Sequence, residues 1–339
     1  MEAIYHIPAM LKETIEGLAI KPGGVYVDVT FGGGGHSRAI LERLDANVQR
    51  DNVQCTKESG HLYSLDHDIE AYENVQRDNV QCTKDEGVFV NNSKWTFVHS
   101  NFRYLRNWMD YYGVKEIDGL LADLGVSFHH FDCPERGFSF RYSAPLDMRM
   151  NQTARRTAAD IVNSYSEEEL AKLFWLYGEM KNGRAVARAI VKARAQKPIL
   201  RTEELINAAL NLHITPPGME DSRELDIPAQ YKKDLARLFQ ALRIEVNDEM
   251  GALREMLVAA RDLLKPGGRI AILTYHSLED RLVKNFLRSG NLEGTIEKDF
   301  YGNALTPFDV IEKGRTASDD EVERNPRSRS AKLRVAEKK

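Results

Sequence analysis

Residues 28–36 read Asp28-Val-Thr-Phe-Gly-Gly-Gly-Gly-His36, and this stretch decides the predicted fold. A short apolar strand is expected over residues 25–30, and a helix over residues 37–44 follows the glycines. Glycines at a strand-to-helix turn let the backbone bend sharply and approach a ligand closely, and the helix offers N–H groups at its amino end. By itself, such a turn fits NAD, FAD or S-adenosylmethionine equally well.

An acidic residue at the end of the second expected strand, residues 61–66, supports a cofactor site. In folds of this kind an acid about 20 residues after the glycines holds the ribose hydroxyls. Asp66 lies 31 residues after Gly35, but the 11-residue sequence NVQRDNVQCTK at 47–57 recurs unchanged at 74–84. Removing one copy leaves a spacing of 20, so both copies are predicted to be polar loop extensions.

The position of Asp28 inside the turn separates the candidate cofactors. A carboxylate there repels a pyrophosphate, whereas it can pair with the ammonium group of a methionine moiety. We therefore expect S-adenosylmethionine rather than a dinucleotide, with Asp28 among the residues that bind it.

Further strands are expected at residues 95–99 and 117–125, with a helix over 102–112. This alternation predicts an α/β fold with a mainly parallel sheet and helices on both faces. Residues 151–228 have mostly helical patterns, and one long amphipathic helix is expected from about 233 to 257, before a fifth strand at 269–275. The predicted domains are a first core part (1–127), an inserted helical substrate-binding domain (128–232), and a second core part with a basic C-terminal tail (233–339).

The composition is that of a globular protein: 42% of the 339 residues are hydrophobic and the net charge is −4. No apolar run approaches the roughly 18 residues of a membrane span, and the start has no basic segment followed by an apolar one. Three scattered cysteines indicate neither a disulfide framework nor a zinc site. We expect a cytoplasmic protein without a membrane partner or a catalytic metal; the oligomeric state stays open.

The reaction site is predicted at the end of the fourth strand, where Asp123-Leu-Gly-Val-Ser127 follows apolar residues. Ligands of open parallel sheets bind at this edge. A carboxylate there can accept hydrogen bonds from an exocyclic amine and turn its nitrogen toward a methyl group, although Asp123 is equally suited to capping the next segment. Asp123 and Ser127 are the catalytic candidates in this block.

The segment Tyr275-His-Ser-Leu-Glu-Asp-Arg281 follows the fifth strand. Tyr275 is the third catalytic candidate, because enzymes that modify a base take it out of the stack and an aromatic ring can hold it. His276 is more typical of a packed strand-end histidine than of a proton carrier.

Two basic segments are candidates for RNA binding. The stretch 181–201 has seven cations and no acid, and Arg184, Arg188 and Lys192 form one helical stripe. Such a stripe is equally typical of a solvated helix face. The stretch 324–339 has seven cations and one acid, and its Arg327, Arg329 and Lys332 are expected to contact phosphates without reading sequence.

Taken together, these motifs resemble the ribosomal RNA small subunit methyltransferase H family. The matching blocks are residues 6–8, 28–37, 66–68, 123–127, 135–140, 145–150, 239–243, 246–248, 275–281 and 325–330. They run in order along nearly the whole chain, and their combination is specific although each block alone is not.

The resemblance implies a class I, Rossmann-like methyltransferase with a helical insert. It implies methylation of N4 of a cytidine at the decoding centre of 16S rRNA, with free rRNA or the small ribosomal subunit as partner. It implies S-adenosylmethionine contacts at Gly34, Gly35, His36, Asp66, Phe102, Asp123 and His130. His130 stands where the family usually has glutamine, and Lys232-Lys-Asp-Leu-Ala-Arg237 replaces a frequent His-Pro-Ala.

Two alternatives belong to other classes of function. A DNA cytosine-N4 methyltransferase usually has a proline-rich block after the fourth strand, which Asp123-Leu-Gly-Val lacks. A non-enzymatic RNA-binding assembly factor would not need the paired glycine turn and strand-end acids. Cofactor binding without turnover on any ribosomal substrate would favour the assembly factor.

Overall fold

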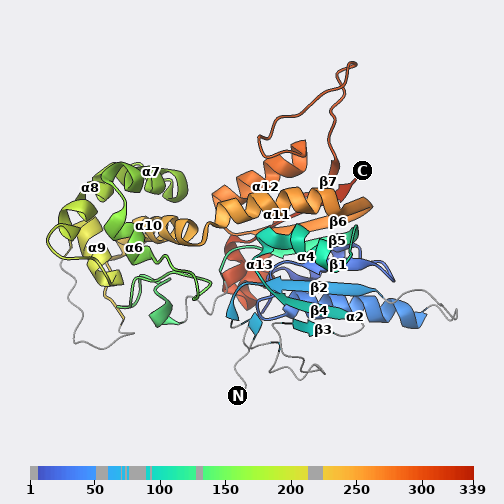
Figure 1. Cartoon of the computed structure of the whole chain (residues 1–339), viewed down its shortest axis with the longest axis horizontal. Coiled ribbons are helices and arrows are strands. Elements are labelled where there is room, and N and C mark those ends of the chain that lie inside the picture. Colours follow the sequence, from blue (N-terminus) through green and yellow to red (C-terminus); the bar gives the residue numbers. More distant parts are fainter. Residues whose placement is uncertain are drawn as a thin grey trace. The chain divides into compact units, whose positions relative to one another are not determined.

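The structure is a computed structural model that describes residues 7–50, 60–69, 71–72, 75, 89–91, 94–126, 133–212 and 224–339, with backbone only at 45–50 and 89–91. The chain forms two compact units (Figure 1). The core unit comprises Met1–Gly125 and Met250–Lys339, and the helical unit comprises Val126–Glu249.

The core unit is built on one sheet, whose described strands run in the order β3-β4-β2-β1-β5-β6-β8-β7. Its centre is parallel: β4 (Trp95–His99), β2 (His61–Asp66), β1 (Val25–Asp28), β5 (Ile117–Asp123) and β6 (Leu264–Thr274). Three strands pair antiparallel: β3 (Phe89–Asn91) with β4, β8 (Lys332–Lys338) with β6, and β7 (Phe308–Thr316) with β8. The predicted mainly parallel α/β sheet is confirmed.

Successive residues of a strand point to opposite faces of the sheet, where they pack against helices. One apolar cluster joins Tyr26, Leu121 and Leu333 to side chains of α1 (Leu11–Leu18) and α2 (Gly35–Arg50). The strand neighbour Leu120 is equally buried but points to the opposite face, as successive strand residues do. In the described part of the unit, the other α-helices are α4 (Leu105–Tyr111), α11 (Glu249–Leu263), α12 (Ser277–Ser289) and α13 (Asp319–Arg324).

Three expectations are corrected by the structure. The long helix is two helices, α10 (Ala229–Asn247) and α11, because Asp248 between them adopts the left-handed conformation with φ 47°. The basic C-terminal tail is not a tail, since residues 332–338 form β8 inside the sheet, where the four consecutive residues 333–336 are buried. The first repeat copy is not wholly a loop, because α2 continues to Arg50. Most of both copies lies outside the described residues.

The helical unit contains α6 (Ala158–Ser164), α7 (Glu167–Gly178), α8 (Gly183–Arg194), α9 (Thr202–Leu210) and α10. Capping boxes at Thr157/Asp160 and Ser166/Glu169 begin α6 and α7 by satisfying their first N–H groups. The unit ends at Glu249 rather than at the predicted 232, because Leu238 and Leu242 of α10 pack in its core.

Among the described helices, none combines the length and the apolar character needed to cross a membrane.

Candidate active site

The carboxyl ends of the parallel strands bring the predicted residues to one edge of the core unit. Asp28 ends β1, Asp66 ends β2 and Asp123 ends β5. The connection from β1 leads to β2 on one side, whereas the connection from the adjacent β5 leads to β6 on the other side. Such a switch point is where open α/β sheets bind ligands.

The glycine turn occupies this switch point. Gly32 and Gly34 have φ of +52° and +73°, a region that favours glycine. A Cβ on Gly34 would lie 2.6 Å from the Phe31 ring, whereas one on Gly32 would meet nothing within 4 Å. The turn is therefore tight at Gly34 and open at Gly32. Gly35 begins α2 and is closed against Pro8, since a Cβ there would lie 2.8 Å from Cγ of that proline.

Asp66 holds the glycine turn in place at Gly32. Its Oδ2 accepts the N–H of Gly32 at 2.8 Å, and its Oδ1 accepts the N–H of Asp68 at 3.0 Å. A carboxylate has about four acceptor positions, so the half-buried Asp66 retains capacity for ribose hydroxyls. Phe102, also half-buried, begins the short helix η1 (Phe102–Tyr104) just beyond β4 at the same edge.

Asp28 lies beneath the turn rather than in it. Its side chain is fully buried, Oδ1 accepts from the backbone and hydroxyl of Thr30, and Oδ2 accepts from the Ser37 hydroxyl at 2.7 Å. Burial raises the pKa of Asp28 above its ordinary value. This geometry makes Asp28 a support of the turn, and the direct cofactor contact expected from the sequence stays a prediction.

Asp123 is held from two sides. Its backbone N–H donates to the Thr30 hydroxyl at 2.6 Å, and its Oδ1 accepts the hydroxyl of Tyr275 at 2.7 Å. The side chain is 12% exposed, and its Oδ2 lies 3.7 Å from Nδ1 of His36. Burial lowers the pKa of His36, which favours the neutral ring, with Nε2 bonded to the carbonyl of Ala9 at 3.2 Å. The carboxylate is therefore fixed in place and reaches the surface of the edge.

Tyr275 presents its hydroxyl, and not only its ring, to the site. Burial, together with the neighbouring Asp123 carboxylate, raises the pKa of Tyr275 well above 10, so the hydroxyl stays a donor. Its ring lies beside Gly125, where a Cβ would come within 3.4 Å. The stacking role predicted for Tyr275 stays a prediction; the structure adds a positioning contact to Asp123.

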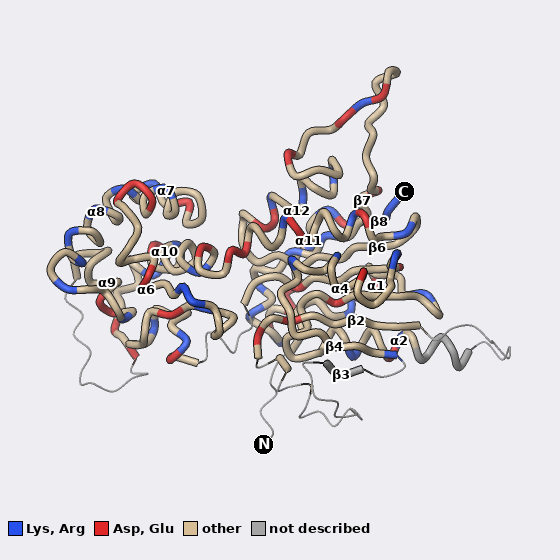
Figure 2. Tube along the Cα trace, in the orientation of Figure 1, with Lys and Arg blue, Asp and Glu red and all other residues tan. Residues whose placement is uncertain are grey.

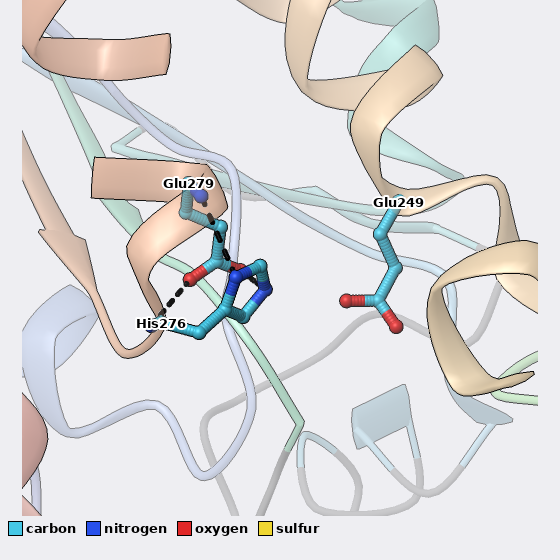
Figure 3. Close-up of side chains that lie close together, drawn as sticks. All are labelled: Glu249, His276 and Glu279. Atoms are coloured by element: carbon cyan, nitrogen blue, oxygen red, sulfur yellow. Dashed lines mark hydrogen bonds and ion pairs between the residues drawn. The ribbon is translucent and has the colours of Figure 1, made fainter. Parts of the chain in front are cut away.

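A capping box between His276 and Glu279 (Figure 3) fixes the backbone next to this tyrosine. The buried Glu279 accepts the N–H groups of Tyr275 and His276 at 3.0 and 3.4 Å, and His276 Nδ1 accepts the N–H of Glu279. His276 is thus the N-cap of α12, as its strand-end position suggested. Glu249, also drawn in Figure 3, belongs to the helical unit and pairs with Arg243 at 2.8 Å. The expected absence of a catalytic metal stays a prediction.

Sequence reasoning missed Thr30 and Glu279. Thr30 joins the ends of β1 and β5 by donating to Asp28 and accepting from Asp123. Glu279 was visible as the acid three residues after the N-cap position, the usual spacing of a capping box. Ser127 and His130 lie outside the described residues.

The two basic segments differ in environment. Arg184, Arg188 and Lys192 are exposed along α8, where Figure 2 shows a run of cations, and Arg188 pairs with Glu167 at 3.3 Å. In the C-terminal segment, Arg327 and Arg329 are exposed on the short helix η3 (Pro326–Ser330). Lys332 begins β8 and lies 3.6 Å from Asp280, so part of its charge is balanced within the fold.

The sheet order, the glycine turn after β1 and the acids ending β2 and β5 together define a class I, Rossmann-like methyltransferase. Comparison with known proteins gives the particular family. Residues 3–339 match the MraW methylase family, and the chain belongs to it.

Relatives named ribosomal RNA small subunit methyltransferase H match over the full length. The chain is 53% identical to the one from Phocaeicola vulgatus, covering 99% of this chain and 98% of the relative, and 52% identical to the one from Bacteroides thetaiotaomicron, covering 100% and 99%. A solved structure, a putative rRNA-methylase from Clostridium thermocellum, aligns with a TM-score of 0.40 at 13% identity, covering 98% of this chain and all of that one.

Proposed function

We propose that this methyltransferase transfers a methyl group from S-adenosylmethionine to N4 of a cytidine at the decoding centre of 16S rRNA, in the cytoplasm. The observation that carries the proposal is the fixed carboxylate of Asp123, held by Thr30 and Tyr275 beside the glycine turn. The full-length relatives named for small-subunit rRNA support the choice of substrate.

The residues at the edge fit S-adenosylmethionine. Gly32 opens onto free space, and the half-buried Asp66 retains acceptor positions for a ribose. We assign cofactor contacts to Gly34, Gly35, His36, Asp66 and Phe102, with Asp28 supporting the turn and His130 as a further contact. When bound, the cofactor supplies an electrophilic methyl group on a sulfonium.

Asp123 positions the nucleophile in this proposal. The exocyclic amine of cytosine is a weak nucleophile because its lone pair is delocalised into the ring. Hydrogen bonds from the amine to Asp123 favour a tetrahedral nitrogen that faces the methyl group. A nitrogen–carbon bond forms as the methyl–sulfur bond breaks, which leaves a neutral thioether, and the surplus proton of the amine passes to water. The Tyr275 hydroxyl keeps the carboxylate oriented while this occurs, and Ser127 stays a candidate for a further contact.

RNA binding is assigned to two surfaces. Arg184, Arg188 and Lys192 on α8, with Arg327, Arg329 and Lys332 near the C-terminus, offer cations for phosphates. Phosphate contacts set the affinity and the orientation of the RNA but do not read its sequence. We therefore assign the selection of the target cytidine to the catalytic site around Asp123.

The test is transfer of a labelled methyl group to small ribosomal subunits from cells that lack the gene. We expect N4-methylcytidine when the RNA is digested and its nucleosides are identified by mass. Methylation at another atom, or transfer to DNA cytosine alone, would overturn the proposal.

A further inference from the structure

The segment between α12 and β7 carries two aromatic side chains that the catalytic site does not use. It projects from the rest of its unit (Figure 1). We name residues 296–305 the aromatic hairpin: Lys298 and Ala304 form an antiparallel bridge, and Phe300 and Tyr301 lie at the tip. Phe300 is 97% exposed and Tyr301 is 86% exposed.

The tip is held in one conformation by Asp299. Its Oδ1 accepts the N–H groups of Tyr301 and Asn303 at 2.9 and 2.8 Å, and its Oδ2 accepts the side-chain amide of Asn303 at 2.9 Å. Gly302, with φ +87°, closes the turn by donating to the Asp299 carbonyl at 3.0 Å. Ordering a turn in this way reduces the entropy lost when its side chains bind a partner.

The two rings form a single apolar knob. They pack edge to face with centroids 5.6 Å apart and an interplanar angle of 86°. Tyr111 of the core unit differs, since it is 73% exposed but packs against both Trp108 and Tyr112 at the end of α4. Exposed aromatics with no internal packing role are typical of protein interfaces, where a few such residues provide most of the binding energy.

The charge around the knob indicates what it binds. Residues 291–307 contain three acids, Glu293, Glu297 and Asp299, and one base, Lys298. Glu293 and Glu297 are exposed. Such a segment repels the phosphates of RNA but complements a basic protein surface.

The aromatic hairpin lies far from the edge of the sheet where we propose that the reaction occurs. Helix α12 begins beside Tyr275 at the catalytic edge and runs for 13 residues, about 20 Å at 1.5 Å per residue, before the segment begins. The segment then enters β7, whose Phe308 pairs with Lys338 at the other end of the sheet. A ligand of the hairpin is therefore remote from the target base.

We propose that the aromatic hairpin docks the enzyme onto a basic protein surface of the small ribosomal subunit, with Phe300 and Tyr301 entering an apolar pocket there. This rests on the proposed function for the identity of the particle. Because the hairpin and the reacting edge lie at opposite ends of the sheet, only a large, assembled substrate engages both.

The test is photo-cross-linking to purified small subunits with p-benzoylphenylalanine at position 301, and at position 111 as the control. We expect a protease-sensitive, ribonuclease-resistant adduct at 301 only, lost when Phe300→Ala is added. Both side chains are exposed, so these changes leave the fold intact. An adduct to RNA, or none above the control, would overturn the proposal.

Methyl transfer provides a second measurement. Phe300→Ala/Tyr301→Ala is expected to raise KM for assembled subunits by about 10- to 30-fold, the size of one interface hot spot, with transfer to naked 16S rRNA unchanged. Equal loss on both substrates, or loss on neither, would contradict it. If the unaltered enzyme methylates neither substrate, the proposed function fails, while the cross-link still decides whether the hairpin docks.

Discussion

The sequence predicted a function both for the sheet edge that contains Asp123 and for the basic stripe of α8, but the side chains of the two regions are held in place differently. At the edge, Asp123 is bonded to residues 93 and 152 positions away in the chain. On α8, Arg184, Arg188 and Lys192 are all exposed, and Arg188 pairs with the half-buried Glu167 of the neighbouring helix α7. A fixed group loses its function when one contact is removed, whereas exposed cations contribute individually small and additive amounts.

The largest effect is expected for Asp123→Ala. Losing the carboxylate that orients the amine should lower kcat by about 100- to 1000-fold, the range for removing one preorganised electrostatic group. The dissociation constant of S-adenosylmethionine, measured by calorimetry, should change far less. Asp123→Asn serves as the control of matched size and should retain part of the activity. A kcat within twofold of the original for Asp123→Ala would remove this residue from the mechanism.

Next is Gly34→Ala, which places a Cβ 2.6 Å from the Phe31 ring at φ +73°. We expect cofactor binding to weaken by at least about tenfold, equivalent to 1.4 kcal/mol. Gly113→Ala is the matched control, because φ is +70° there and a Cβ meets nothing within 4 Å. Both variants should lose about 1 kcal/mol of stability from backbone strain. Equal cofactor affinity in the two would contradict a tight turn at the site.

Tyr275→Phe should have an intermediate effect. It removes the hydroxyl that donates to Asp123 and keeps the ring, so kcat should fall about tenfold if orientation is its role, as a charged hydrogen bond contributes about 1.5–3 kcal/mol. If stacking on the base dominates, Tyr275→Phe should be nearly silent while Tyr275→Ala is strongly impaired. Measuring kcat and KM for RNA in both variants distinguishes the two roles.

The triple change Arg184→Ala/Arg188→Ala/Lys192→Ala tests the other side of the comparison. KM for RNA should rise several-fold with kcat unchanged, and the slope of log affinity against log salt should become shallower by about 2, at 0.7 per phosphate contact. Lys232→Ala/Lys233→Ala, on an exposed part of α10 in the same unit, is the control. An unchanged salt slope would identify the stripe as a solvated face.

The smallest effect is expected from His36. Because burial lowers its pKa in the folded state, the unfolded chain takes up a proton first as the pH falls. The free energy of unfolding should therefore be fully maintained above the unfolded value of about 6.5 and decline below it. His36→Gln should flatten this decline in chemical denaturation from pH 8 to pH 5, with each protein referred to its own stability at pH 8. An identical slope would show that His36 does not titrate differently on folding.

The sheet and its edge were predictable because both follow from local patterns. Short apolar segments bounded by turn residues indicated β1, β2, β4, β5 and β6. Because Asp66 and Asp123 each end a parallel strand, their positions alone placed them at one edge of the sheet. The hydrogen bond from the Asp123 N–H to the Thr30 hydroxyl was not predictable, because the two residues are distant in sequence. The break at Asp248 was missed because apolar spacing continues across it. The segment after Lys332 was predicted to be a tail because its cations obscured the run of buried residues 333–336 in β8.

The hydrogen bonds of Asp28 show what the glycine motif did not indicate. The motif placed Asp28 at the turn, but it carried no sign that the buried carboxylate accepts hydrogen bonds from Thr30 and Ser37 and so supports the turn. The direct contact with S-adenosylmethionine stays a prediction. In the helical unit, helical patterns predicted the helices, whereas the capping boxes that begin α6 and α7 became apparent only in the structure.

The most direct measurement is methyl transfer to 16S rRNA or small subunits in which the decoding-centre cytidines are individually replaced by uridine. Uridine has no exocyclic amine at the acceptor position. We expect that one such replacement abolishes labelling by the unaltered enzyme, and that Asp123→Ala fails on every substrate. Full labelling of all the uridine variants would contradict an N4-cytidine acceptor at the decoding centre.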